Sequence, residues 1–262
     1  MGNMKSSLVL TAATVASMIG EGIVCPMAGN AADWSSTEMH FKVGKLESPF
    51  AGGSANTGYV RLQHASGNGI GDVFFFVDFS DDSMSDGFNE REAYGEGYAY
   101  FSSAKIFGAT YGGIVKDVGV LVGINYDADV GYLSYLPGAY IDWKAPPSFR
   151  FLRTQFTAVI DDSSVPQKNG WQIDTQWGYD FQIAKQRFSF EGHWEYTANQ
   201  RSVLGKQKDW FLAQPQLRWD VGYAVTGKAD VVFLGTEYQY WNNKLGTSVD
   251  ESAFQALAVW RF

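Results

Sequence analysis

The feature that most constrains this chain is an alternation of apolar and polar residues, repeated in segments of about ten beyond the N-terminal region. In the segment 171–181, for example, Trp171 and Ile173 alternate with Gln172 and Asp174. Successive side chains of a β-strand point to opposite faces, so a period of two predicts strands, and an amphipathic helix would not produce it. We expect twelve strands, at 35–46, 56–65, 72–80, 92–102, 117–127, 131–143, 148–160, 171–181, 186–197, 209–221, 228–241 and 252–262.

The connections between these segments differ in length. Long, polar connections follow the odd-numbered segments, at 47–55, 81–91, 161–170, 198–208 and 242–251. Connections after the even-numbered segments are mostly short. Two connections break the pattern: 103–116 is long where a short turn is due, and 127–129, which follows an odd-numbered segment, is short. Long loops at one end and tight turns at the other, with an even number of strands, are typical of an outer-membrane barrel.

Alternation alone does not separate a soluble sandwich from a membrane barrel, because the strands of both alternate. Here the polar faces are rich in charge, and the apolar faces carry Trp, Tyr and Phe near the strand ends, as aromatic girdles at two membrane interfaces require. Lipid offers the backbone no hydrogen bonds, so the sheet must close on itself. We therefore predict an all-β fold, a 12-stranded antiparallel transmembrane β-barrel formed by residues 32–262 in the cell outer membrane.

Composition excludes several other classes of protein. A mean hydropathy of -0.18, without a run of about 20 apolar residues past the N-terminus, excludes a bundle of transmembrane helices. An aromatic content of 16% is too high for a disordered chain. A net charge of -8 without a basic block gives no electrostatic footprint for nucleic acid, so we expect no nucleic-acid partner.

Residues 1–31 have the features of a secretory signal peptide. Lys5 is followed by an apolar stretch, 8–19, and by a small-residue cleavage site at 29–31. The alternatives are a buried or frayed helix, and a lipid anchor on Cys25, which the preceding residues do not favour. Without this segment the chain has no cysteine, which fits an exported protein that needs no disulfides.

Several stretches of the chain resemble the Tsx-type nucleoside-specific channels of Gram-negative outer membranes. They are Phe74-Phe75-Phe76-Val77-Asp78, Tyr135-Leu136-Pro137-Gly138-Ala139, the segments 214–220 and 235–244, and Gln255-Ala256-Leu257 before the terminal Trp260-Arg261-Phe262. The resemblance implies a twelve-stranded barrel with a narrow lumen, lined by aromatic and ionisable residues, through which nucleosides diffuse. The family includes divergent nucleoside-binding outer-membrane proteins whose substrates differ.

The chemistry of a nucleoside predicts what such a lumen should contain. Its flat, uncharged base stacks on an aromatic ring for roughly 1–3 kcal/mol, and its ribose hydroxyls donate hydrogen bonds to carboxylates or amides. Four predicted inward faces combine these groups and form the candidate substrate-binding set: Phe74, Phe76 and Asp78; Tyr94, Glu96 and Tyr98; Trp210, Gln214, Gln216, Arg218 and Asp220; and Glu237, Gln239 and Trp241. For each of these residues, the alternative is a structural role that fills space or supports the wall.

Catalytic motifs are lacking in the sequence. His40, His64 and His193 fall on predicted strands, and none has a metal-binding spacing with Cys or a second His. There is also no G-x-S-x-G elbow, phosphate-binding glycine loop or cysteine nucleophile. We therefore expect no enzyme, no metal and no cofactor.

The leading hypothesis is a channel for passive, selective uptake of nucleosides or similar small polar aromatic solutes. The alternatives are an adhesion or phage-receptor barrel that acts through its extracellular loops, and a membrane enzyme acting on lipid. Expected partners besides the solute are outer-membrane lipid and lipopolysaccharide, and the barrel-assembly machinery, which would recognise the terminal Phe262. The barrel is expected to be a monomer.

Overall fold

The computed structural model describes residues 32–50, 52–82, 84, 91–163, 169–198, 201–202 and 205–262. The predicted signal segment, 1–31, lies outside the described residues.

The described chain is almost entirely β-sheet. The strands of the main sheet are β1 (Trp34–Glu47), β2 (Ser54–Asn68), β3 (Gly71–Asp82), β4 (Glu92–Ser102), β5 (Val115–Asp127), β6 (Tyr132–Tyr135), β7 (Gly138–Trp143), β8 (Phe149–Asp161), β9 (Gly170–Ile183), β10 (Gln186–Ala198), β13 (Trp210–Ala213), β14 (Gln216–Trp219), β15 (Val232–Asn242) and β16 (Glu251–Arg261). A separate hairpin joins β11 (Arg201–Ser202) to β12 (Gly205–Lys206).

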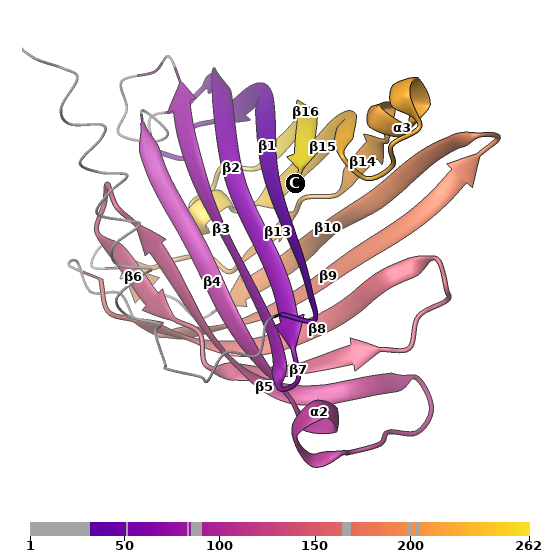
Figure 1. Cartoon of the computed structure of the whole chain (residues 1–262). Coiled ribbons are helices and arrows are strands. Elements are labelled where there is room, and N and C mark those ends of the chain that lie inside the picture. Colours follow the sequence, from indigo (N-terminus) through magenta and orange to yellow (C-terminus); the bar gives the residue numbers. More distant parts are fainter. Residues whose placement is uncertain are drawn as a thin grey trace, which may run out of the picture. The chain divides into compact units, whose positions relative to one another are not determined.

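The main sheet closes on itself. Neighbouring strands of the wall pair antiparallel, and β1 pairs with β16 from Glu38↔Arg261 to Gly44↔Gln255. Because β6 and β7 together occupy one position in the wall, and β13 and β14 another, the barrel has twelve positions. Figure 1 shows β1 returning beside the C-terminal strands β15 and β16. Closure leaves the main sheet without a free edge strand among the described residues, and the prediction of a 12-stranded antiparallel barrel is confirmed.

Two predicted strands are interrupted by proline. Pro137 separates β6 from β7, and Pro215 separates β13 from β14, because proline has no N–H to donate to the ladder. The carbonyls of both prolines still accept hydrogen bonds from the next strand, from Ala158 N at 3.0 Å and Tyr238 N at 2.9 Å. The wall is therefore bent at these points but not opened.

Gly192 makes room for the second of these breaks. It has a φ of 153°, and a Cβ atom there would lie 2.4 Å from the carbonyl oxygen of Gln214 and 2.9 Å from Cα of Pro215. Only glycine combines this backbone conformation with such a close approach of two backbones.

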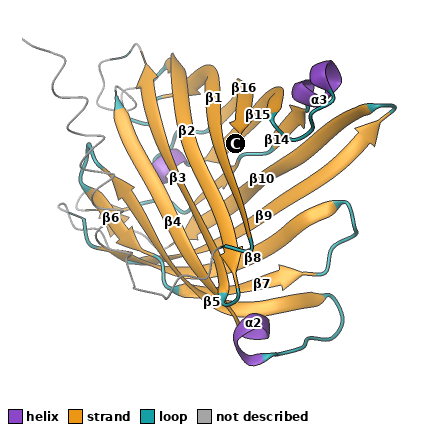
Figure 2. Ribbon diagram, viewed as in Figure 1, coloured by secondary structure: helices purple, strands orange, loops and turns teal. Residues whose placement is uncertain are grey.

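The two ends of the barrel differ, and we name them by their connections. The turn end holds the tight connections β2–β3 and β9–β10, the beginning of β1 and the end of β16. The loop end is the other end of the barrel and holds connections such as β1–β2 and β15–β16. The turn end also carries two short helices, α2 (Ser103–Phe107) and α3 (Val221–Thr226), drawn in purple in Figure 2. Neither described helix is long and apolar enough to cross a membrane.

Helix α3 corrects the prediction for this part of the chain. The predicted strand 209–221 ends at Trp219, and the predicted strand 228–241 begins only at Val232. The cause is Asp220, whose carboxylate caps the helix by accepting a hydrogen bond from Tyr223 N at 2.8 Å, while Gly227 ends the helix in a left-handed conformation. The connection after the tenth position is therefore long, whereas the β5–β6 connection at the loop end is short.

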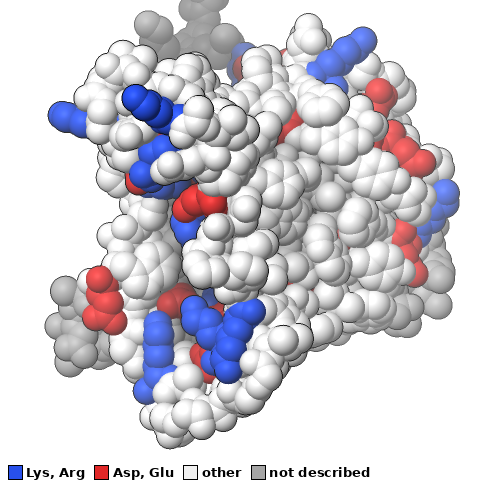
Figure 3. Space-filling view, turned by 90° about the vertical axis from the view of Figure 1, so that its right-hand side faces the viewer, with Lys and Arg blue, Asp and Glu red and all other residues white. Residues whose placement is uncertain are grey.

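The outer face of the barrel is apolar. Outward side chains such as Phe41, Val43 and Phe254 are 47%, 56% and 70% exposed. Aromatic rings contact one another near both ends of the wall, as in Trp171–Tyr196 toward the loop end and Phe181–Phe188 toward the turn end. Figure 3 shows a broad area of this kind, without charged side chains. Such an exterior matches a lipid bilayer with aromatic residues at its interfaces.

The inner face is mostly polar and densely packed. Glu237, Gln255 and Arg218, for example, are at most 2% exposed. The inner face also contains apolar patches, one of which is built from Tyr98, Tyr100, Leu121, Leu136, Tyr140 and Val159. A twelve-stranded barrel is small enough for side chains to fill much of its interior.

Candidate solute pathway inside the barrel

All the predicted lumenal residues lie on the inner face of the wall. Phe76, Tyr98 and Gln239 are buried, whereas outward neighbours such as Phe79 and Tyr240 are exposed. The inner side chains form four groups, each defined by its residues below: a polar ladder, a turn-end charge cluster, an aromatic wall and an acid–histidine cluster. Binding of a solute to any of them stays a prediction.

The polar ladder consists of Lys42, Gln216, Arg218, Glu237, Gln239, Lys244, Glu251 and Gln255. It begins at the loop end in η1 (Lys244–Gly246), where Lys244 Nζ donates to Glu251 at 2.8 Å. Gln239 donates to the same carboxylate, and Gln255 Nε2 donates to Gln239 at 3.3 Å and to Glu237 at 2.9 Å. These bonds join β15 to β16 across the inner surface.

The ladder continues through Glu237 toward the turn end. This carboxylate accepts hydrogen bonds from Lys42 Nζ at 2.9 Å and from Gln216 Nε2 at 2.5 Å. Gln216 in turn accepts from Arg218 Nε at 2.8 Å, and Arg218 Nη1 donates to Glu38 at 3.1 Å. One continuous row of bases, acids and amides therefore runs along this wall, and its members are hydrogen-bonded to one another.

Lys244 lies outside the membrane-spanning strands and is almost fully buried. Burial lowers the pKa of its ammonium group below the usual 10.5, although the carboxylates of Glu251, Glu47 and Glu92 oppose this shift.

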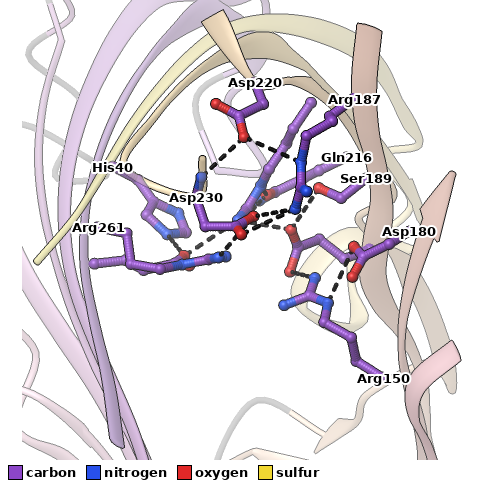
Figure 4. Close-up of polar contacts among 12 residues, drawn as sticks. His40, Arg150, Asp180, Arg187, Ser189, Gln216, Asp220, Asp230 and Arg261 are labelled. Atoms are coloured by element: carbon purple, nitrogen blue, oxygen red, sulfur yellow. Dashed lines mark hydrogen bonds and ion pairs between the residues drawn. The ribbon is translucent and has the colours of Figure 1, made fainter. Parts of the chain in front are cut away.

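The turn-end charge cluster contains Glu38, Arg150, Asp180, Arg187, Glu191, Asp220, Asp230 and Arg261, most of them seen in Figure 4. Arg261 Nε donates to Glu38 at 2.7 Å, and Arg187 Nη2 donates to Asp230 at 2.9 Å. Arg150 bridges two strands, with Asp180 at 3.2 Å on β9 and Glu191 at 2.8 Å on β10.

A cavity of about 250 Å³ opens among these side chains, and its lining includes Arg150, Arg187, Asp230 and Arg261. Figure 3 shows a hollow with acidic and basic side chains around it. The side chains of Arg150 and Arg187 are each 34% exposed, so they keep contact with water, unlike Arg218 at 2%. The volume falls below the roughly 300–1,000 Å³ of drug-sized ligand sites, so the cavity suits a small solute.

The aromatic wall follows β3 and β4. Phe76 lies 6.2 Å from Phe74 and 6.1 Å from Tyr94, measured between ring centroids. The guanidinium of Arg61 stacks 4.0 Å from the Phe76 ring and binds Asp78 with two hydrogen bonds of 2.7 and 2.6 Å. This stacking fixes the cation beside the rings.

Glu96 lies within the aromatic wall and is bound by hydroxyls. Tyr94 and Tyr98 donate to its two carboxylate oxygens at 2.6 and 2.8 Å. Gly123 on β5 makes room for the Tyr98 ring, since a Cβ there would lie 2.6 Å from it. Among the described residues, Glu96 forms no ion pair with Lys or Arg.

Trp210 and Trp241 form a pair of rings on the inner face of β13 and β15, with centroids 5.5 Å apart. The indole N–H of Trp241 is buried and has no hydrogen-bond partner within the described part of the chain. A buried indole donor usually finds an acceptor, so this group is free to bind a solute or water.

Several of the predicted binding residues are already bonded to other parts of the protein, and Asp220 and Arg218 are two examples. The Asp220 carboxylate accepts hydrogen bonds from the backbone N–H groups of Tyr223 and Asp230, both at 2.8 Å. Arg218 is held by Gln216, Glu38 and Glu191. These contacts leave little capacity for a solute at either side chain.

The acid–histidine cluster of Asp174, His193 and Glu195 is a grouping that the sequence analysis missed. Nδ1 of His193 lies 3.0 Å from Oδ2 of Asp174, and one donor atom from each of the three residues lies within 4.8 Å of the others. The signal that could have found it is the two-residue turn between β9 and β10. Counting outward from that turn pairs Asp174 with Glu195 and Gln176 with His193, as the structure shows.

A closed antiparallel sheet with an apolar exterior and a polar interior defines a β-barrel of the outer-membrane type, and such an exterior belongs in that membrane. No family model and no curated protein matches the sequence. The resemblance to Tsx-type channels therefore stays a prediction.

The fold is similar to those of several solved outer-membrane barrels. One is the NanC porin, which is 11% identical with a TM-score of 0.49, the match covering 85% of this chain and 98% of that one. Another is an outer membrane channel from Pseudomonas putida F1, 6% identical with a TM-score of 0.46, covering 89% and 97% of the two chains. A third is the Acinetobacter baumannii outer membrane protein Omp33, 10% identical with a TM-score of 0.37, covering 87% and 98%. These values are too low to carry an argument about substrate or function.

Proposed function

We propose that this protein is an outer-membrane channel that lets small polar solutes cross passively. The observation that carries the proposal is the inner face of the closed barrel, where aromatic rings and hydrogen-bonding groups face the interior and a charged cavity opens at the turn end. A barrel that served only as a scaffold would not need rings beside unsatisfied donors such as the Trp241 indole.

The solutes that fit best are nucleosides or similar uncharged aromatic molecules. Tyr94 and the Trp210–Trp241 pair offer ring faces for a base, and the Glu96 carboxylate offers acceptors for ribose hydroxyls. We expect each contact with the solute to be weak, because a conducting site must release its solute as readily as it binds it.

Ion current through single barrels in planar bilayers tests this proposal. Adenosine and thymidine should reduce the current in a concentration-dependent way, and an uncharged sugar should not. Trp241→Ala should raise the half-blocking concentration at least about 5-fold, the equivalent of about 1 kcal/mol of lost stacking.

A matched control is Trp171→Ala, which removes an indole from the outer face, where Trp171 is 39% exposed. This variant should leave nucleoside block unchanged. Block by the sugar but not by nucleosides would refute the selectivity, and equal effects of the two tryptophan variants would refute the assigned ring.

A second candidate function is that of a receptor barrel acting through its loops. The observation that favours it is the dense packing of the polar ladder, whose residues Glu237 and Gln255 have no exposed surface. Such a barrel would conduct no solute, whereas exchange of the loops at 81–91 and 198–208 would abolish adhesion or phage binding. The channel would keep its flux after the same exchange.

A further inference from the structure

We propose that Asp174, His193 and Glu195 form a binding site for a divalent transition-metal ion on the inner wall of the barrel. The three side chains project from neighbouring strands, β9 and β10, and offer one imidazole nitrogen and two carboxylates. This donor set suits zinc and similar ions, whereas calcium and magnesium prefer oxygen donors alone. The site is independent of the proposed solute and would exist in a barrel that transports nothing.

The geometry is close to that of a metal site. Donor atoms bound to one zinc ion at 2.0–2.2 Å in a tetrahedral arrangement lie about 3.3–3.6 Å apart. Here the three donor atoms lie within 4.8 Å of one another, so side-chain rotations that move them about 1 Å closer would complete the site. The His193 side chain is 25% exposed toward the bore, which gives an ion a path to the site, while that of Asp174 is 3% exposed.

The surrounding hydrogen bonds orient the donors as in a metal site. Nε2 of His193 lies 2.9 Å from Oε1 of Gln214, an atom that only accepts, so this nitrogen donates. Nδ1 faces the Asp174 carboxylate at 3.0 Å, and an ion bound there would replace the Nδ1 proton. Gln214 is itself fixed, because its Nε2 donates to Gln239 at 2.7 Å. On the other side, Gln172 Nε2 donates to Glu195 at 2.8 Å and leaves the second carboxylate oxygen of Glu195 for the ion.

Unsatisfied oxygens in the same patch point to a cation. Oδ1 of Asp174 is buried without a hydrogen-bond partner among the described residues. The same holds for Oγ1 of Thr197, a side chain 2% exposed that lies two residues from Glu195 on the same face, and for Oγ1 of Thr157. Thr157 and Thr197 flank Gln172 in the register of β8, β9 and β10. Buried acceptors without donors are costly unless a ligand or water satisfies them.

The charge balance points the same way. Carboxylates of the polar ladder and the turn-end cluster form ion pairs with Lys or Arg, as Glu237 does with Lys42. Within the part of the chain that the structure describes, Asp174 and Glu195 form none, and Glu96, which interacts electrostatically with both, forms none either. A single imidazole does not balance three carboxylates in a closed interior, whereas a divalent cation bound to it would cancel two of the three negative charges.

The test is direct binding of Zn²⁺ to the barrel, purified without a polyhistidine tag and held in detergent micelles, by calorimetry and equilibrium dialysis. We expect one ion per barrel, and Co²⁺ in its place should give an absorption spectrum of nitrogen and oxygen ligation. Asp174→Asn and Glu195→Gln should each weaken binding at least about 10-fold. Gln214→Leu, which releases the imidazole, should weaken it about 10–100-fold.

Two control variants keep the test specific. His64→Gln and Asp81→Asn change a histidine and an aspartate that point outward, away from the bore, and should leave the affinity unchanged. Circular dichroism and thermal unfolding identify any variant that fails to fold, and Gln214→Leu keeps all three donors if a carboxylate variant fails. The proposal is overturned if no ion binds at 1 mM Zn²⁺, roughly the limit of weak sites, if binding survives both carboxylate variants, or if Ca²⁺ occupies the site equally well. None of these outcomes affects the solute-block experiment, so the two proposals fail separately.

Discussion

The ion pair of Lys42 and Glu237 gives the sharpest prediction of stability, because it lies in the middle of the polar ladder and is almost wholly buried. The two side chains are 2% and 0% exposed, and Nζ and Oε1 are 2.9 Å apart. At an effective dielectric constant of about 20, their attraction amounts to about 6 kcal/mol. Much of this offsets the cost of removing both charges from water.

The structure predicts unequal effects of the two single substitutions. Lys42→Met leaves the Glu237 carboxylate with two neutral donors, Gln216 and Gln255. Glu237→Gln removes the carboxylate that pairs with Lys42 and turns an acceptor oxygen into a donor that faces these amide donors. We expect a loss of about 3 kcal/mol in unfolding free energy for the first change and about 3–5 kcal/mol for the second. The double variant should lose at least about 2 kcal/mol less than the sum of the two.

Urea unfolding of the barrel in lipid vesicles, followed by tryptophan fluorescence, measures all four corners of this double-mutant cycle. The nine Trp residues provide the signal. The reasoning is refuted if the two losses simply add, or if Lys42→Met is the more damaging change. Either result would mean that water in the bore screens the pair, so that the burial of the ladder does not determine its energy.

Further predictions concern the turn-end cavity, the last loop and the break at Pro215. Replacing Arg150 or Arg187 with Gln removes a water-accessible cation from the cavity, so the reversal potential in a salt gradient should shift toward cation selectivity; no shift would place the cavity outside the ion path. The lowered pKa of Lys244 means that the folded protein binds that proton less tightly than the unfolded chain, so stability should rise with pH from the lowered pKa up to 10.5, and Lys244→Met should abolish this rise. Gly192→Ala should reduce the yield of folded barrel sharply, judged by circular dichroism after refolding, since its Cβ would lie 2.4 Å from a backbone oxygen; normal folding would show that the strands can separate there.

The strands were predictable because apolar and polar residues alternate along almost every strand of a membrane barrel. The predicted segment 92–102 coincides with β4, and most other predicted bounds fall within two or three residues of the observed ones. The assignment of inner and outer faces follows from the same period, and it placed Glu96 and Glu237 on the inner face. The rest depended on local chemistry that strand periodicity does not carry, such as the helix cap at Asp220 and the missing N–H of Pro137 and Pro215.

Contacts between side chains of distant strands could not be predicted from the sequence, for a different reason. Arg218 meets Glu38, a residue 180 positions away, only because β1 and β16 close the sheet with a particular stagger. Closure of the sheet was predictable because lipid offers the backbone no hydrogen bonds. The stagger between β1 and β16, however, depends on the sum of all strand registers around the barrel. The β9–β10 hairpin is an exception, since its short turn fixes the register locally, and the acid–histidine cluster could have been found there.

Selectivity in such a barrel depends on the groups that the wall leaves unsatisfied. Most lumenal acids and bases are bonded to one another, as Glu237 is to Lys42, and these groups support the wall and offer a passing solute little. The exceptions among the described residues include the Trp241 indole, Oδ1 of Asp174 with Oγ1 of its neighbours Thr157 and Thr197, Nδ1 of His40 and Oε1 of Gln255. A buried donor or acceptor without a partner costs about 1–3 kcal/mol, and a ligand that satisfies it recovers that energy. The lumen should therefore discriminate by hydrogen bonding at these points, and substitutions elsewhere along the bore should change stability before they change specificity.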